Sequence, residues 1–389
     1  SMLPDEQVRI RCAIVRGGTS KGVYILENEL PRDPETRERV ILAIFGSPDK
    51  RQIDGLGGAD PLTSKVAIVG PCHAPEADVT YTYYQVGIDI PRLFGRGICG
   101  NISAGVGPFA IDEGLVKAEE PETTVRIYNT NTGRVLVATV PTLCGRSRVA
   151  GDLAIAGVPG TGARVSLDFS QCAGAITGRL LPTGHLKDRV AVPGIGEVEV
   201  SIVDMCTVQV FVRAEDLGLT GVEQPSDVDG NSELLERLES IRGSVAVLLG
   251  LASSVPAARL ESANVPHLVL VAAPRDYTAL NGRAVNGSEV DLVARMMFMQ
   301  KMHKTYAGTG AVCTAVSAMI GGTLASEMVR DEARANGYVR IGHPGGVFPV
   351  EVRVQSRGSE HVVEKAALWR TARRIMDGYV YVRRDRIEA

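Results

Sequence analysis

The chain has 389 residues, of which 44% are hydrophobic and 22% charged, and its net charge is −3. This composition is typical of a globular protein with two domains of ordinary size, and the small net charge argues against nucleic acid or a membrane surface as a main partner. No apolar run approaches the roughly 20 residues of a membrane span, and the seven cysteines form no CxxC pair, so we expect a reduced, cytoplasmic protein.

Short β-branched or alternating segments predict strands along the whole chain. In the first half they are VRIRCAIV (8–15), VYIL (23–26), KVAIV (65–69), VTYTYYQV (79–86), VRIYN (125–129) and RVLVATV (134–140). In the second half they are VAVPGIGEVEVSIVD (190–204), VQVFV (208–212), PHLVLVAA (266–273), VRIGH (339–343), FPVEVRV (348–354) and GYVYV (378–382). Helical periodicity predicts peripheral helices at 34–46, 231–252 and 288–304.

The two halves of the chain repeat the same order of elements. VYILENEL (23–30) resembles VFVRAEDL (210–217), and VRIYNTNTGRVLVATV (125–140) resembles VRIGHPGGVFPVEVRV (339–354). Between these landmarks each half has a small-residue helix, in 99–115 and in 307–320, with Ala307 opposite Cys99. Helices that are apolar on all faces are expected to be buried. The repeat predicts a duplicated, mixed α+β fold with domains at 1–184 and 185–389, whose central helices lie near 100–115 and 309–322.

The starts of both central helices predict an anion-binding site. A helix start leaves backbone N–H groups unpaired and carries partial positive charge, and a carboxylate can satisfy both. If the halves pack together, the two starts can converge on one cleft that suits a di- or tricarboxylate. The alternative is two capped helices without any ligand. The residues at these starts are small or polar: Gly100, Asn101 and Ser103 in the first helix, and Gly308, Thr309 and Gly310 in the second.

Two further residues are candidates for chemistry. Lys65 follows the glycine-rich stretch IDGLGGADPLTS (53–64) and begins a strand that is predicted to be buried. A surface lysine needs no such setting, whereas a lysine at the mouth of a buried strand can act as a base. Cys99 directly precedes the first central helix, a position that favours the thiolate, although an inert buried cysteine fits the same pattern.

Several long stretches resemble the PrpF family within the diaminopimelate epimerase-like fold. They are RGGTSKGVY (16–24), GSPDKRQIDGLGGADPLTSKVAIV (46–69), CGNISAGVGPFAI (99–111), NTNTG (129–133), LPTGH (181–185), RAEDLGLTG (213–221), GAVCTA (310–315), IGHPGG (341–346) and RTARRIMDG (370–378). The resemblance implies two pseudo-symmetric domains, each with a central buried helix wrapped by a mostly antiparallel β half-barrel. It also implies a cofactor-independent isomerase that moves a C=C bond, or inverts its geometry, in a small polycarboxylate such as 3-methylitaconate, 4-oxalomesaconate or 2-methylaconitate.

The resemblance assigns the proton transfer to Lys65, as general base and acid, and leaves Cys99 as a second acid/base or a polariser. A lysine must be uncharged to accept a proton, and burial favours that form. Epimerases of this fold use two facing thiols, but here Ala307 occupies the second thiol position and Cys313 lies further along the helix.

We assign carboxylate binding to residues of both halves, with Arg16 and Lys21 as reserve cations. Some of the residues assigned to carboxylate binding also have structural interpretations. Thr19 and Ser20 can form a turn, and Ser64 can simply begin a strand. His303 can end a helix, and His343 can lie in a turn. The set is Thr19, Ser20, Ser64, Gly100, Asn101, His303, Gly308, Thr309, Gly310 and His343.

Two other classes of function stay open at this point. An amino-acid racemase or epimerase can use the same fold, although Ala307 opposite Cys99 argues against it. A non-catalytic carboxylate-binding accessory protein is the other alternative. We expect no metal, because the histidines lie far apart without an HExxH motif, and no nucleotide cofactor, because a GxGxxG after a strand is absent. The expected partners are a small polycarboxylate substrate and a second copy of the chain in a homodimer.

Overall fold

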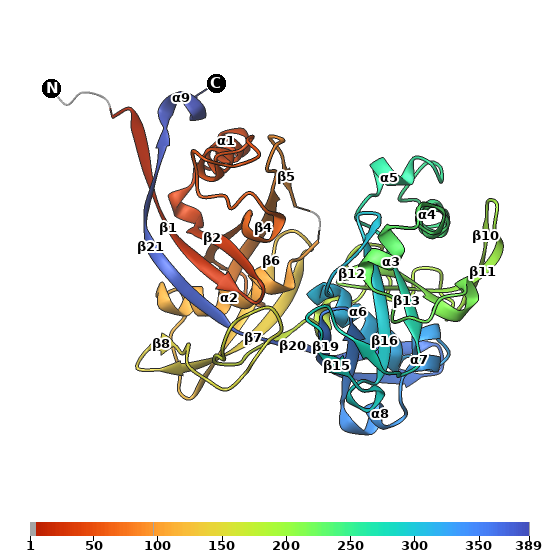
Figure 1. The fold of residues 1–389 in the computed structure, drawn as a ribbon. Helices are drawn as coiled ribbons and strands as arrows, with labels where there is room; N and C mark the ends of the chain where they lie inside the picture. The colour runs from red at the N-terminus through yellow and green to blue at the C-terminus, as the bar shows by residue number, and fades with distance from the viewer. Residues whose placement is uncertain (1–4, 96, 389) are drawn as a thin grey trace. The chain divides into compact units, whose positions relative to one another are not determined.

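The computed structural model describes residues 5–95 and 97–388, and the chain divides into two compact units. Unit 1 contains the residues up to Leu167 together with those from Trp369 onwards, and unit 2 contains Asp168–Leu368. This division differs from the single boundary expected between residues 184 and 185. The reason is that β21 (Ala372–Arg383) pairs antiparallel with β1 (Gln7–Gly17), which returns the end of the chain to unit 1 (Figure 1).

Unit 1 opens with β1 and closes with β21, and most of its other elements lie between them in sequence. Its remaining elements are β2 (Ser20–Leu26), η1 (Glu27–Glu29), α1 (Pro34–Phe45), η2 (Pro61–Thr63), β3 (Lys65–Pro71), β4 (Val79–Val86), β5 (Leu93–Phe94), α2 (Gly100–Asp112), β6 (Glu122–Asn129), β7 (Arg134–Leu143), β8 (Arg146–Ser147) and α9 (Arg384–Ile387). A further strand, β9 (Val165–Asp168), spans the division between the units.

The strands of unit 1 mix antiparallel and parallel neighbours around α2. β1 pairs with β2, β3 with β4 and β6 with β7 in antiparallel fashion, whereas β2 and β3 run parallel, as do β4 and β6. α1 covers one face of β2 and β3, where Ile41 and Ile44 pack with Val23 and Val66. The alternate residue Tyr24 faces α2, which is buried along nearly its whole length.

Unit 2 contains a longer list of short elements around the second central helix. They are η3 (Ser170–Cys172), β10 (Asp188–Val192), β11 (Gly196–Met205), β12 (Thr207–Arg213), η4 (Ala214–Leu217), α3 (Pro225–Asp229), α4 (Ser232–Leu248), α5 (Ala258–Glu261), β13 (His267–Ala272), β14 (Tyr277–Thr278), β15 (Ala284–Val285), η5 (Gly287–Glu289), β16 (Leu292–Phe298), β17 (Lys301–Met302), α6 (Gly308–Met319), α7 (Leu324–Met328), α8 (Glu332–Asn336), β18 (Tyr338–His343), β19 (Gly346–Arg357) and β20 (Glu360–Arg370), whose last two residues belong to unit 1.

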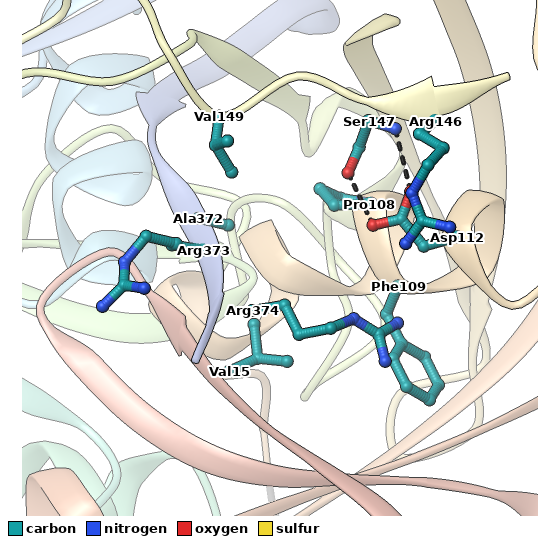
Figure 2. Close-up of a pocket in the computed structure, with 10 residues that line it drawn as sticks. All are labelled: Val15, Pro108, Phe109, Asp112, Arg146, Ser147, Val149, Ala372, Arg373 and Arg374. Atoms are coloured by element: carbon teal, nitrogen blue, oxygen red, sulfur yellow. Dashed lines mark hydrogen bonds between the residues drawn. The ribbon is translucent and has the colours of Figure 1, made fainter. Parts of the chain in front are cut away.

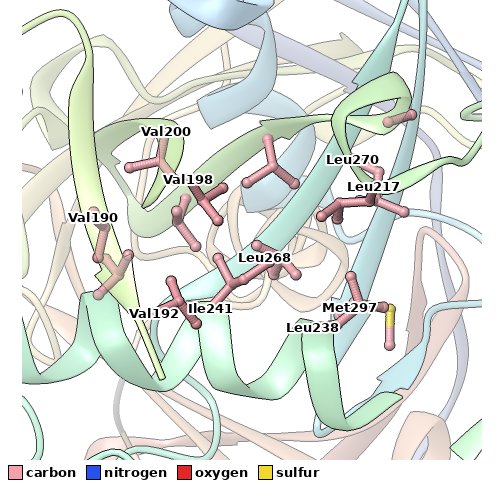
Figure 3. Close-up of a cluster of buried hydrophobic side chains, with 14 of the residues drawn as sticks. Val190, Val192, Val198, Val200, Leu217, Leu238, Ile241, Leu268, Leu270 and Met297 are labelled. Atoms are coloured by element: carbon pink, nitrogen blue, oxygen red, sulfur yellow. The ribbon is translucent and has the colours of Figure 1, made fainter. Parts of the chain in front are cut away.

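The pairing of strands in unit 2 repeats that of unit 1. β11 and β12 are antiparallel, β12 and β13 parallel, β13 and β16 antiparallel, β16 and β18 parallel, and β18 and β19 antiparallel. α4 covers one face of these strands, and Figure 3 shows Leu238 and Ile241 of α4 packed against Leu268 and Leu270 of β13. α6 is buried at every position. Both central helices, the duplication and the α+β class therefore agree with the sequence analysis.

The segment 288–304 is the exception, because it forms strands and not the expected helix. Its Leu, Ala, Arg and Met residues have high helix propensity, but β16 lies between β13 and β18, and Leu292–Met297 are all buried. A central strand that is covered on both faces reads as a continuous apolar run without alternation. Long-range strand pairing thus overrides the local preference.

Candidate active site

The turn between β1 and β2 packs tightly onto the start of α2. The side chain of Asn101 donates to Thr19 Oγ1 (3.0 Å) and accepts from the Thr19 backbone N–H (3.3 Å). Gly18 has a positive φ of +54°, and a Cβ on it would lie 2.1 Å from Asn101 Oδ1. Only glycine fits there without displacing Asn101. The structure therefore brings together Thr19 and Asn101, two of the residues expected to bind substrate.

Lys65 and Cys99 lie in direct contact in unit 1. The Lys65 side chain crosses from the first residue of β3 to the start of α2, where Nζ is 3.2 Å from Cys99 Sγ and 3.1 Å from Ser20 Oγ. Lys65 is only 7% exposed and Ser20 is buried, whereas Cys99, the N-cap of α2, is partly exposed. A nearly buried amine that shares a contact with a more accessible thiol is an arrangement suited to proton transfer.

Two tyrosines of β4, Tyr81 and Tyr83, lie near Cys99. Burial raises the pKa of both Tyr81 and Tyr83 well above the usual phenol value, and the neighbouring Cys99 adds to the rise. Both hydroxyls therefore stay protonated at neutral pH and act as neutral hydrogen-bonding groups. Tyr83 donates to Gln85 Oε1 (3.2 Å), and Tyr81 accepts from Ser103 Oγ of α2 (3.3 Å).

Arg370 is a member of this site that the sequence analysis missed. Its side chain is 8% exposed, and its Cδ lies 3.1 Å from the point where a Cβ on Gly18 would sit, beside Asn101. Burial lowers the pKa of Arg370 to about 10, and electrostatic attraction to Cys99 opposes that fall. Arg370 is thus a buried cation at neutral pH.

The position of Arg370 depends on the return of the chain to unit 1. The Gly18 backbone N–H donates to the Thr371 carbonyl (2.9 Å), which fixes the residue after Arg370 against the β1–β2 turn. The stretch RTARRIMDG contributed to the family resemblance, but no local pattern linked it to Cys99. Only the pairing of β21 with β1 makes that link.

The remaining predicted residues of unit 1 have defined local partners. Ser64 is fully buried, and its hydroxyl donates to Gln52 Oε1 (2.9 Å). Gly100 is the first residue of α2. The reserve residue Arg16 donates to the carbonyls of Gly18 (3.0 Å) and Thr371 (3.2 Å), so it stabilises the turn, whereas the other reserve, Lys21, is exposed.

In unit 2, the predicted residues Gly308, Thr309 and Gly310 form the first turn of α6, and all three are buried. Ala307 is the N-cap of α6, the position that Cys99 holds at α2. Cys313 lies deep in the helix, where its Sγ contacts the Val203 carbonyl (3.5 Å) and burial raises its pKa. Cys313 is therefore no second catalytic thiol.

The two predicted histidines of unit 2 lie at strand ends. His303 follows β17, so its interpretation as a helix terminus is wrong, and its Nδ1 accepts from the Thr305 backbone N–H (3.0 Å). His343 ends β18, is 3% exposed and accepts from the Gly345 N–H (3.0 Å). These contacts fix the orientation of both rings.

A separate cavity of about 300 Å³ opens near the other end of α2. Figure 2 shows Ser147 hydrogen-bonded to the Asp112 carboxylate, and the Arg374 guanidinium beside the Phe109 ring. Arg374 is paired with Glu113 (3.0 Å) and Asp377 (3.1 Å), and the Asp112 carboxylate accepts from Ser147. None of the site residues predicted from sequence lines this cavity. Its lining residues are Val15, Pro108, Phe109, Asp112, Arg146, Ser147, Val149, Ala372, Arg373 and Arg374.

Within residues 5–95 and 97–388, no three His, Cys, Asp or Glu side chains are grouped so as to hold a metal ion. In the same part of the chain, no helix is both long and apolar enough to span a bilayer.

The duplicated fold, with one buried central helix in each unit, places the chain in a structural class, the diaminopimelate epimerase-like fold. A hydroxyproline epimerase from Agrobacterium vitis shares this fold with a TM-score of 0.54 and 14% identity, over 96% of this chain and 93% of its own. The chain belongs to the PrpF family, since the family model described as "PrpF protein" matches residues 7–383.

Relatives of known structure or activity match almost the entire chain. The 3-methylitaconate isomerase of Eubacterium barkeri is 52% identical over 98% of this chain and 100% of its own length. The 4-oxalomesaconate tautomerase of Pseudomonas putida is 42% identical over 97% of this chain and 98% of its own length. A crystal structure of a methylitaconate delta-isomerase matches with a TM-score of 0.90 and 50% identity. The match covers 99% of this chain and 98% of the chain in that structure. The protein is an isomerase.

Proposed function

We propose that the protein catalyses a 1,3-allylic proton shift in a small unsaturated di- or tricarboxylate, and that 3-methylitaconate is its substrate. The contact between Lys65 Nζ and Cys99 Sγ at 3.2 Å carries this proposal, because the reaction needs proton-transferring groups held close together. The 52% identity to a 3-methylitaconate isomerase supports this substrate over 4-oxalomesaconate, for which the relative is 42% identical.

In the proposed reaction, Lys65 in its neutral form removes a proton from the carbon next to the alkene. The C–H electron pair enters the conjugated system and gives a dienolate whose charge is spread onto a substrate carboxylate. The resulting ammonium group then returns a proton to the carbon two positions away, and the double bond forms at its new place. The step is redox-neutral and leaves Lys65 neutral again, so it needs no external reactant.

Cys99 and Arg370 complete the site in this proposal. Cys99 acts as the second acid/base or polarises the substrate beside Lys65. Arg370 binds the carboxylate that carries the dienolate charge, because a buried guanidinium that is charged at neutral pH offers paired donors to a carboxylate. Thr19, Ser20, Asn101 and the N–H groups at the start of α2 supply further donors, as a positively polarised helix end suits an anion.

An amino-acid racemase remains the second candidate function. The alanine at the N-cap of α6 argues against it, because two-thiol epimerisation requires a cysteine there. Incubation with amino acids in deuterated water separates the two: the proposal expects no deuterium at the α-carbon.

The experiment that tests the proposal follows 3-methylitaconate, 2-methylaconitate and 4-oxalomesaconate by proton NMR in deuterated water. We expect migration of the double bond in 3-methylitaconate with incorporation of deuterium. Lys65→Met should lower kcat by about 10²- to 10⁴-fold, the usual contribution of general acid–base catalysis. The exposed Lys117→Met is the matched control. Wild-type turnover in a correctly folded Lys65→Met variant would show that Lys65 is not the base.

Two expectations about the setting of the enzyme belong to the same proposal. The seven free thiols support a reducing compartment such as the cytoplasm, because cysteines in oxidising compartments are usually paired. The homodimer stays a prediction, which sedimentation or light scattering can test.

A further inference from the structure

The turn NTNTG (129–133) joins β6 to β7 beside the strand that carries Tyr83. β4 and β6 run parallel, and their pairing ends where Tyr81 meets Asn129. Beyond that point the chain turns away from β4 into β7, whereas β4 itself continues to Val86. The backbone of Tyr83 therefore needs hydrogen-bond partners that β6 no longer supplies.

The side chain of Asn131 supplies these partners in place of a strand. Its Oδ1 accepts from the Tyr83 backbone N–H (2.8 Å), and its Nδ2 donates to the Tyr83 carbonyl (2.9 Å). The same Nδ2 donates to the Gly95 carbonyl (2.9 Å), and Asn129 Nδ2 donates to Asn131 Oδ1 (3.1 Å). A carboxamide can donate two hydrogen bonds and accept two, so the Asn131 side chain is fully paired and its orientation is fixed.

The hydrogen bond to Gly95 reaches the segment that leads into Cys99. Gly95 directly follows β5, which pairs with the end of β4, and it precedes the N-cap of α2 by a few residues. A Cβ on Gly95 would lie 2.8 Å from the Tyr84 ring and 3.2 Å from Asn131 Nδ2, so the backbone there leaves little room for a side chain. Asn131 thus ties the approach to α2 onto β4.

Tyr83 connects the same anchor to the Cys99 sulfur. Gln85 is paired with Lys65 across β4 and β3, so Tyr83 and Gln85 lie on the face of the sheet that Lys65 shares. The Tyr83 hydroxyl donates to Gln85 Oε1 (3.2 Å). Burial and the nearby Cys99, with which the phenol forms a hydrogen bond, raise the pKa of Tyr83 well above its usual value. The hydroxyl that Asn131 holds in place is therefore a direct neighbour of the thiol.

Gln85 extends these contacts to the other group of the proposed reaction. Its Nε2 donates to the carbonyl of Ser64 (3.1 Å), the residue before Lys65. Since Gln85 also accepts from Tyr83, one side chain joins the backbone at Lys65 to the phenol beside Cys99. The end of β4 therefore supports both Lys65 and Cys99, and Asn131 fixes this end of the strand.

We propose that Asn131 is a positioning residue, which holds Cys99 against Lys65 by anchoring Tyr83 and Gly95. This role rests on the proposed function, because Lys65 and Cys99 are its proton-transferring groups. All five residues belong to unit 1. A displacement of reacting groups by about 1 Å can cost on the order of 10²-fold in rate. Loosening Cys99 should therefore lower kcat, whereas KM changes little because Asn131 acts through the backbone and not on the substrate.

Kinetics of the whole protein give the first test. Asn131→Ala removes all four hydrogen bonds of the carboxamide. Asn131→Asp keeps the shape of the side chain but places an oxygen, which cannot donate, against the Tyr83 and Gly95 carbonyls. Both variants should lower kcat for 3-methylitaconate by about 10- to 100-fold and change KM by less than about 3-fold.

Asn231→Ala is the matched control for a loss of stability without a loss of positioning. It removes the side-chain bond that caps α4 in unit 2, where Asn231 accepts from the Leu234 N–H (3.1 Å). We expect this variant to keep the kcat and KM of the wild type.

Hydrogen exchange gives a second test that does not depend on turnover. We expect amide exchange at residues 98–104, the start of α2, to be about 5- to 30-fold faster in Asn131→Ala than in the wild type. Exchange there should be unchanged in Asn231→Ala. In a Tyr83→Phe background, Asn131→Ala should cost less in kcat than it does in the wild type, because part of its effect acts through the missing hydroxyl.

Failure of this role and failure of the proposed function give different results. If Asn131→Ala keeps the wild-type kcat, or if exchange at residues 98–104 stays as slow as in the wild type, Asn131 does not position Cys99, even with full isomerase activity. If the wild type converts none of the three unsaturated acids but Asn131→Ala still speeds exchange at 98–104, the anchoring of Cys99 stands and the proposed reaction fails. Loss of fold in both Asn131 variants, seen by circular dichroism, would identify a purely structural residue and would also refute the role.

Discussion

Arg370 is the residue whose replacement tests the electrostatic part of the site most directly. A buried cation that pairs with a substrate carboxylate contributes about 1.5–3 kcal/mol through charged hydrogen bonds. We therefore expect Arg370→Met to lower kcat/KM by about 10- to 100-fold. Arg370→Lys should recover only part of the loss, because an ammonium group cannot donate in the paired geometry of a guanidinium. Steady-state kinetics measures both, with the exposed Arg357→Met as the control.

His267 predicts a dependence of stability on pH. It is buried, and neither ring nitrogen has a hydrogen-bond partner among residues 5–95 and 97–388. Burial lowers its pKa from the ordinary 6.5 to about 4 in the folded protein, so between these values the unfolded chain binds more protons, and stability falls as the pH falls. Linkage gives a loss of about 2 kcal/mol from this residue between pH 7 and pH 5. Urea unfolding at both pH values should show that His267→Phe lacks this loss. Equal losses in the two proteins would mean that His267 is protonated in the folded state.

Among single residues, the sequence identified those whose role follows from their place in a helix or strand. Lys65 begins a strand and Cys99 caps a helix, and both positions follow from pattern. Arg370 and His267 did not stand out, because an arginine before β21 and a histidine before an apolar strand are common. Their special character comes from burial and from the partners that they lack or gain, which are properties of the folded chain.

The β1–β2 turn is the element on which the geometry of the site depends. Gly18→Ala would place a methyl group 2.1 Å from Asn101 Oδ1 at a φ of +54°. We expect a loss of about 2–4 kcal/mol in the free energy of unfolding, together with lower activity, because the strain adds to a clash at the start of α2.

Gly114→Ala is the matched control for that substitution. Gly114 also has a positive φ, +77°, but a Cβ there would meet nothing within 4 Å. The Gly114→Ala variant should therefore lose only about 1 kcal/mol in the free energy of unfolding, from the strain of a positive φ. It should keep its activity. Thermal and urea unfolding measure both changes. Equal effects of the two substitutions would show that the contact with Asn101 does not matter.

Among the elements, buried helices and alternating strands were predictable, and buried strands of helix-forming residues were not. α2 and α6 are recognisable because small apolar residues follow a glycine-rich start. β16 was misassigned because Met, Leu and Ala favour helices, and burial on both faces removes the alternation that marks a strand. The parallel pairing with β18 that stabilises β16 lies outside any local window.

For the whole molecule, the path of the chain makes the two units unequal. Unit 2 is a continuous segment, whereas unit 1 needs the residues from Trp369 onwards. β21 pairs with β1 from Gln7 to Gly17, and the Thr371 carbonyl anchors the turn at Gly18. The sequence repeat reveals the duplication but not this return, because strand pairing between the two ends of a chain leaves no periodic signal.

This inequality predicts different behaviour of fragments. We expect a fragment of residues 168–368 to unfold cooperatively by circular dichroism and urea titration, since it contains the whole hydrophobic cluster under α4 and the whole buried helix α6. A fragment of residues 1–167 should be unfolded or molten, because β1 loses its outer neighbour and the site loses Arg370. Joining 369–389 to residue 167 through a long glycine–serine linker should restore cooperative unfolding. If 1–167 alone unfolds cooperatively, β21 is dispensable for unit 1, and the support that it gives to the β1–β2 turn must come from elsewhere.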